Sequence, residues 1–97
     1  MKRAQAINLL CRHKAELHRL GVERLYLFGS SARDEARDDS DIDLFFDHEK
    51  GKLGLFELMD IREHTTHILG QTADIMTRSG LHPRLRQRIE DSAVLVF

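Results

Sequence analysis

In two parts of the chain, residues that would share one face of a helix recur mostly every three or four positions, and most of them are apolar. The first set consists of Ala6, Leu10, His13, Leu17 and Leu20. This spacing predicts one amphipathic helix over residues 2–20, and Gly21 directly after it is a common helix end. The second set consists of Leu55, Leu58, Met59, Arg62, Thr66 and Leu69. It predicts another amphipathic helix over residues 55–69, ended by Gly70.

Three shorter segments show the features of strands. Residues 22–28 (VERLYLF) are apolar and aromatic and end at a glycine, as a buried strand does. Residues 40–46 (SDIDLFF) alternate between apolar and acidic positions, and residues 72–77 (TADIMT) form a short strand with an aspartate inside it.

Three further segments complete the pattern. Residues 31–37 are predicted to form a short polar helix. Pro83 suits the first position of a helix that runs to about Asp91 and turns Leu85 and Ile89 inward. The final AVLVF is predicted to be a strand or an apolar tail. Because helices and strands alternate, the sequence predicts an α/β fold with a short mixed sheet flanked by helices, and a single domain over residues 1–97.

Composition narrows the class of protein. The 97 residues suffice for one domain, and 41% hydrophobic with 32% charged residues is typical of a globular protein. Fifteen Lys and Arg against sixteen Asp and Glu give a net charge of −1, which favours neither nucleic acid nor a membrane as a partner. One cysteine excludes an internal disulfide, and no apolar stretch has the length of a signal peptide or membrane span. We therefore expect a cytoplasmic protein.

The turn after the first predicted strand has the features of a phosphate site. Gly29 lets a ligand approach the backbone closely, and the start of a helix offers free N–H groups. Ser30 adds a hydroxyl. Arg33, one turn later, is suited either to a phosphate or to a structural ion pair.

Asp41 and Asp43 stand two residues apart in a predicted strand, so both should face the same side. Two carboxylates on one face repel each other unless a cation lies between them, and Mg²⁺ is held by such carboxylates together with phosphates. Asp74, in another short strand, becomes a third carboxylate if the two strands are neighbours. It could then hold a metal ion and accept the proton of an attacking hydroxyl.

Other interpretations of the acidic stretch are less favoured. A calcium loop counted from Asp39 would need glycine and glutamate where Leu44 and Lys50 stand. A merely charged strand face would not require the glycine turn. His64 and His67 are three apart, but they lack an obvious third ligand, so a solvated helix face is predicted for them.

Gly29-Ser30, ten intervening residues and Asp41-x-Asp43, followed by Asp74, resemble the motif of the polymerase-β-type nucleotidyltransferase superfamily. The short length and the segment GSSARDEARDDSDIDL resemble its minimal nucleotidyltransferase (MNT) branch, whose members are often antitoxins of HEPN-domain toxins. One departure is Asp34, where many relatives have glycine.

The resemblance implies transfer of a nucleoside monophosphate, AMP from ATP, to a hydroxyl with release of pyrophosphate. Gly29 and Ser30 would bind the triphosphate, while Asp41, Asp43 and Asp74 would bind Mg²⁺, two ions in all. The acceptor would be a tyrosine of a partner HEPN toxin. Two alternatives remain open, namely a binding-only antitoxin and transfer to a small hydroxyl compound such as an aminoglycoside. Assembly of the chain into a homo-oligomer also remains open.

Overall fold

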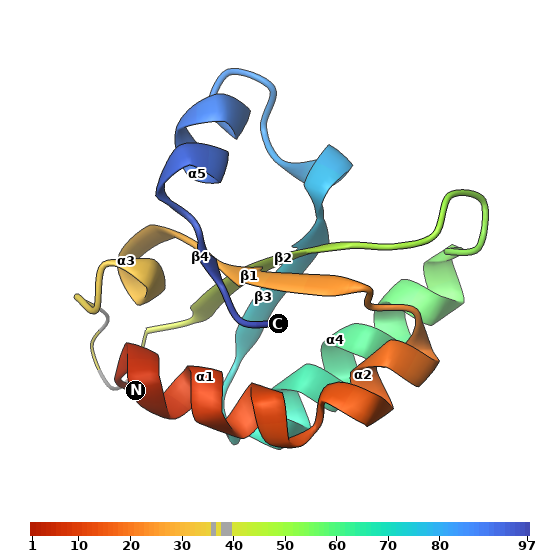
Figure 1. Ribbon diagram of the computed structural model, residues 1–97, viewed down its shortest axis with the longest axis horizontal. Helices are drawn as coiled ribbons and strands as arrows, with labels where there is room; N and C mark the ends of the chain where they lie inside the picture. Colours follow the sequence, from red (N-terminus) through yellow and green to blue (C-terminus); the bar gives the residue numbers. More distant parts are fainter. Residues whose placement is uncertain (36, 38–39) are drawn as a thin grey trace.

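A computed structural model of the chain describes residues 1–35, 37 and 40–97. Its centre is a four-stranded sheet in the order β3-β2-β1-β4 (Figure 1). The strands are β1 (Arg24–Leu27), β2 (Ile42–Asp47), β3 (Ala73–Thr77) and β4 (Val94–Leu95). β1 runs antiparallel to β2 and to β4, whereas β2 and β3 are parallel. The predicted α/β class with a short mixed sheet is confirmed.

Three helices cover one side of the sheet, namely α1 (Arg3–Arg12), α2 (Lys14–Leu20) and α4 (Leu55–Leu69) (Figure 1). The core lies between these helices and the sheet, because Leu10, Leu17 and Ile61 are fully buried together with Leu25 and Leu44 from the strands. Burying a side chain of this size stabilises the fold by about 1.5–3 kcal/mol. Asp43, Phe45 and Asp47 alternate with these core positions along β2, so they belong to the opposite face of the sheet. No helix among the described residues has the length and hydropathy needed to cross a membrane.

The N-terminal helix is interrupted, so the prediction of a single helix over residues 2–20 is wrong. His13 lies between α1 and α2 with φ −108° and ψ 19°, outside the helical region. Its N–H donates to the carbonyl of Leu10, three residues back, and its Nδ1 lies 2.9 Å from the carbonyl oxygen of Leu9. The predicted end at Gly21 is confirmed, since this glycine ends α2 with φ 114°.

The bounds predicted for α4 are confirmed, and so is the burial of Leu69, but the prediction that Leu55 and Met59 belong to the buried face is wrong. Ile61, Thr65 and Leu69 face the core. Leu55 and Met59 are instead 69% and 54% exposed, next to Phe56 at 78%. Thr65 can replace an apolar residue in the core because its hydroxyl donates to the carbonyl of Ile61 at 2.7 Å.

The helix predicted over residues 31–37 is replaced by the single turn α3 (Gly29–Ala32). Asp34 stops it, because its φ of 60° lies in the left-handed region. Glycine adopts this conformation freely, which explains why glycine suits this position in the family motif that the sequence resembles. Asp34 has a second contact, since its carboxylate accepts the N–H of Arg3, the first residue of α1, at 2.8 Å. Residue 36 of the predicted helix lies outside the described residues.

The last helix also differs from its prediction. After β3 comes a short 3₁₀ turn, η1 (Arg78–Gly80), and then α5 (Arg86–Ser92). Pro83 lies in a turn before α5 rather than at its first position. Leu85 is 46% exposed and does not point into the core, while Ile89 is half-buried. In Figure 1, α5 lies on the side of the sheet opposite α1, α2 and α4.

Candidate functional site

Gly29 lies where β1 passes into α3, against the start of β2. Its φ is +64°, and a Cβ atom built on it would come within 2.6 Å of Oδ2 of Asp43. Any side chain here would therefore strain the backbone and collide with this carboxylate. The N–H of Phe28, just before the turn, donates to the carbonyl of Asp43 at 3.0 Å, which fixes the turn beside the carboxylate.

Asp43 and Asp74 are direct partners across the parallel pair β2–β3. Partners in a ladder point to the same face of a sheet, so the two carboxylates share the face opposite the helices α1, α2 and α4. Asp43 is half-buried and Asp74 is exposed. Asp41 is exposed and lies one residue before β2, so the prediction that it belongs to the strand is wrong.

The charges around Asp43 act on its pKa. Burial raises the pKa of its carboxyl group, and the negative charges of Asp74 and Asp41 raise it further, while Arg33 lowers it. A partly buried carboxylate whose charge is disfavoured by two neighbouring acids is one that a bound cation would stabilise.

The donor set fits a hard cation such as Mg²⁺ that shares its ligands with a substrate. Within the described residues, no three acidic, histidine or cysteine side chains lie together as a group that could hold a metal ion. Mg²⁺ commonly takes only one or two carboxylates from a protein and completes its shell with water and phosphates. Asp43 together with Asp74 or Asp41 can supply these one or two carboxylates, next to the turn at Gly29.

Ser30 and Arg33 flank this turn. Ser30 is half-buried, and its carbonyl accepts the N–H of Glu35 at 2.9 Å. The Nε of Arg33 donates to the carboxylate of Glu35 at 3.0 Å, and both side chains are more than half exposed. Exposed ion pairs contribute little to stability, so Arg33 can exchange Glu35 for a phosphate at small cost.

His64 and His67 belong to a different part of the molecule. Both are exposed on α4, and Nε2 of His64 lies 3.3 Å from the carboxylate of Glu16 on α2. The core separates α4 from the sheet face that carries Asp43.

Two residues that fix the strands of this region were not predicted from the sequence. Ser31 is buried, and its hydroxyl accepts the N–H of Asp43 at 3.3 Å, so it joins α3 to the start of β2. The only sequence signal for it was the repeated serine after Gly29. Arg78, directly after β3, pairs with Asp47 at the far end of β2. Its partner could be found only once the register of the two strands was known.

Asp43→Asn is expected to stabilise the protein in the absence of metal and nucleotide. Because the folded state raises the pKa of Asp43, the charged form costs stability as pH rises from the unfolded value of 3.8 through the folded pKa. The cost is fully present above both values, so the variant should have a higher Tm at pH 7. The gain should shrink as the solution is acidified.

Asp47→Asn is the matched comparison, because Asp47 lies on the same strand and face but is paired with Arg78. Its loss should destabilise the protein by about 1–2 kcal/mol. Thermal unfolding of both variants at several pH values tests these opposite signs. A lower Tm for Asp43→Asn at pH 7 would contradict the charge repulsion described here.

Comparison with known proteins gives consistent matches. A model of the nucleotidyltransferase domain matches residues 10–96. The protein adenylyltransferase MntA of Thermococcus cleftensis is 32% identical over 90 residues, which are 92% of this chain and 90% of that protein. The solved structure of a candidate minimal nucleotidyltransferase superposes with a TM-score of 0.74 at 36% identity, covering 95% of this chain and 89% of the other.

A more distant structural match shows the fold alone. It is a solved complex of a tri-AMPylated Shewanella oneidensis HEPN toxin with an MNT antitoxin. The matched chain superposes with a TM-score of 0.68 at 15% identity, over 98% of this chain and 71% of that one.

Proposed function

Because this chain belongs to the nucleotidyltransferase domain family, we propose that it is an adenylyltransferase that moves AMP from ATP to a hydroxyl of a HEPN-type toxin, and so acts as an antitoxin. The observation that carries the proposal is the placement of Asp43 opposite Asp74 on neighbouring parallel strands, directly beside the side-chain-free turn at Gly29.

One group of residues would bind the phosphates and another would bind the cation. We assign phosphate binding to the turn at Gly29 and Ser30, which lies against Asp43, and to the exposed side chain of Arg33. Asp41, Asp43 and Asp74 would hold Mg²⁺, two ions in all. When bound, Mg²⁺ supplies positive charge that neutralises the phosphates and stabilises the charge that develops in the transition state.

We assign the acceptance of the proton to Asp74. Unlike half-buried Asp43, it is exposed on the open face, where an incoming hydroxyl can reach it. The acceptor oxygen forms a bond to the α-phosphorus as its proton passes to Asp74. The bond between the α-phosphorus and the bridging oxygen breaks, and pyrophosphate leaves with the electron pair.

The exposed position of Asp41 and Asp74 supports a large acceptor, because a protein side chain can approach this face directly. A HEPN toxin as the partner is supported by the relative named protein adenylyltransferase MntA and by the fold shared with the MNT antitoxin of the S. oneidensis complex. We propose a tyrosine hydroxyl as the acceptor within that partner.

Labelled ATP distinguishes this chemistry from alternatives. The chain is incubated with Mg²⁺ and a HEPN-type protein as the partner, using ATP labelled at either the α- or the γ-phosphate. Adenylyl transfer puts the α-label on the partner and leaves the γ-label in pyrophosphate. Peptide mapping then identifies the labelled residue, which we expect to be a tyrosine. Partner that binds tightly but takes up neither label would favour a binding-only antitoxin, and label from the γ-phosphate would mean phosphoryl transfer.

A further inference from the structure

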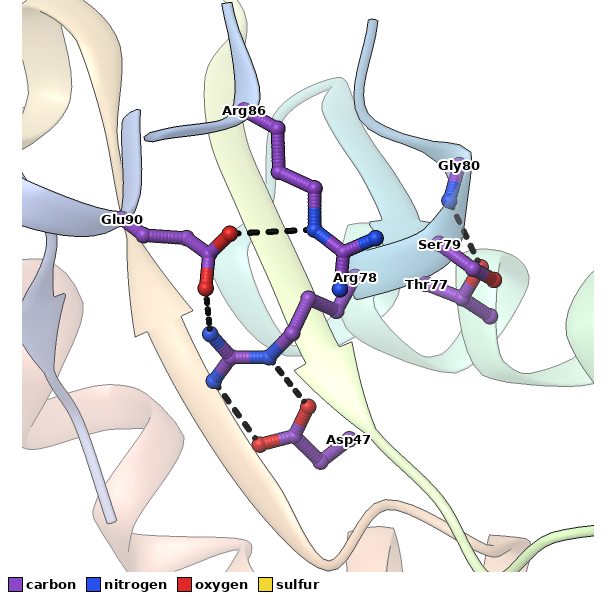
Figure 2. A network of polar contacts seen from close by, with 7 residues as sticks. All are labelled: Asp47, Thr77, Arg78, Ser79, Gly80, Arg86 and Glu90. Carbon is purple, nitrogen blue, oxygen red and sulfur yellow. Dashed lines mark hydrogen bonds and ion pairs between the residues drawn. The ribbon is translucent and has the colours of Figure 1, made fainter. Parts of the chain in front are cut away.

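Arg78 forms the centre of a polar network (Figure 2). It pairs with Asp47 at the end of β2, whereas Gly29 lies against Asp43 near the start of that strand. Its Nε and one terminal nitrogen donate to the two oxygens of Asp47 at 2.7 and 3.0 Å. Its other terminal nitrogen donates to Glu90 at 2.6 Å, and Glu90 also accepts from Arg86 at 3.0 Å. One planar guanidinium group thereby joins β2, the end of β3 and α5.

The network is sheltered from water on its inner side. The guanidinium carbon of Arg78 lies 5.0 Å from the ring centre of Tyr26 and 5.1 Å from that of Phe45, and these two rings stack at 4.8 Å. Phe45 is fully buried although it belongs to the open face. The hydrogen bonds to Asp47 raise the pKa of Arg78, and its bond to Glu90 lowers the pKa of that carboxyl group. Shelter of this kind makes an ion pair more stabilising than an exposed one.

The position of the network follows the same register as the two carboxylates of the candidate site. Asp43 is opposite Asp74, and four residues further along both strands Asp47 meets Arg78. The two pairs are therefore about 13 Å apart on one face of one pair of strands. The first pair is repulsive and the second is attractive. A shift of two residues would keep the apolar pattern of both strands but would separate Asp47 from Arg78.

Glu90 connects this strand pair to α5. All seven residues of α5 are described and none of them is buried, so the helix has no apolar anchor of its own in the core. The bond from Arg78 to Glu90 instead ties it to the end of β3. The turn that carries Arg78 is itself fixed, because Thr77 accepts the N–H of Gly80 at 3.2 Å (Figure 2).

We propose that Arg78 is a positioning residue for nucleotidyl transfer, which with Asp47 holds β2 and β3 so that Asp43 and Asp74 stay opposite each other, and with Glu90 fixes α5 on the same side of the sheet. This inference rests on the proposed function for its effect on turnover. Arg78 lies about four residues from the carboxylates along the strand, so it acts through the strands rather than on the substrate.

The first test measures the strands and α5 without any ligand. Hydrogen exchange followed by mass spectrometry is compared for the full chain and for Arg78→Met, Asp47→Asn and Glu90→Gln. Arg78→Met should speed exchange in both β3 and α5, Asp47→Asn mainly in β3, and Glu90→Gln mainly in α5. Asp91→Asn is the matched control, because Asp91 accepts a hydrogen bond from Gln87 of the same helix and its replacement should change exchange in neither segment. Unchanged exchange in β3 and α5 of Arg78→Met would overturn the proposal.

The second test separates positioning from substrate binding. Asp47→Asn and Arg78→Met, assayed below their melting temperatures, should lower kcat about 10- to 100-fold while KM for ATP changes less than about threefold. Arg78→Lys keeps the positive charge but loses the planar guanidinium group that binds both oxygens of Asp47, so it should behave like Arg78→Met. In the Arg78→Met background, Asp47→Asn and Glu90→Gln should add no further loss. Wild-type kcat in folded Asp47→Asn and Arg78→Met would overturn the positioning role. An inactive wild-type protein would instead refute the proposed function, and the exchange experiment would still decide whether Arg78 holds the strands and α5.

Discussion

Gly29→Val should abolish nucleotidyl transfer while leaving most of the chain folded. The new Cβ would start 2.6 Å from Oδ2 of Asp43, and φ at this position is +64°, which a β-branched residue rarely adopts. The backbone strain is about 1–3 kcal/mol, which the fold can tolerate. Displacing the turn from Asp43 removes the place where phosphates approach, so a loss of turnover of about 10²–10³-fold or more is expected.

Gly51→Val separates the collision from the strain. Gly51 has a comparable φ of +82°, but a Cβ there would meet no described atom within 4 Å. This variant should lose a similar amount of stability and keep its activity. Circular dichroism and an assay of partner labelling compare the two proteins. Normal turnover by Gly29→Val would contradict the role of this turn in holding the triphosphate.

Asp74→Asn should lower transfer by about 10²–10⁴-fold, the range for removal of a general base. An asparagine keeps the shape and the place of Asp74 opposite Asp43, but it can neither accept the proton nor offer a full negative charge to a cation. Activity should not return at higher pH, because the amide does not titrate. The rate of α-label transfer to the partner, measured across pH, is the observable.

Asp60→Asn is the control for this change, because Asp60 is an exposed acid on α4, across the core from the candidate site. It should leave the rate unchanged. If Asp74→Asn were as active as Asp60→Asn, the third carboxylate would have to be sought elsewhere and the assignment of Asp74 would be wrong.

The sequence was informative where the chemistry lies within a short segment. The alternation in residues 40–46 and the aspartate in residues 72–77 placed Asp43 and Asp74 on strands, and the structure makes these residues direct partners. Local rules suffice here because a strand alternates its faces every residue. Asp41 shows the limit, since strand pairing begins only at Ile42 and the alternation could not show where the ladder starts.

The wrong prediction for the buried face of α4 concerns packing between segments that are distant in the chain. Leu55, Phe56 and Met59 look like core residues by type, yet α4 turns Ile61 and Thr65 inward. A single-sequence pattern cannot reveal that a buried threonine satisfies its hydroxyl on its own helix. The contacts of Arg78 were not predicted either, because its partners Asp47 and Glu90 are 31 and 12 residues away along the chain.

The measurement that tests the central claim most directly is the intact mass of the partner after incubation with the chain, ATP and Mg²⁺. The chain is used as wild type and as the double variant Asp41→Asn, Asp43→Asn, and co-purification verifies the complex in both cases. We expect the partner to gain whole AMP units with the wild-type chain and none with the double variant, although both bind it. AMP addition by the double variant at the wild-type rate would contradict the assignment of these carboxylates as the transfer site.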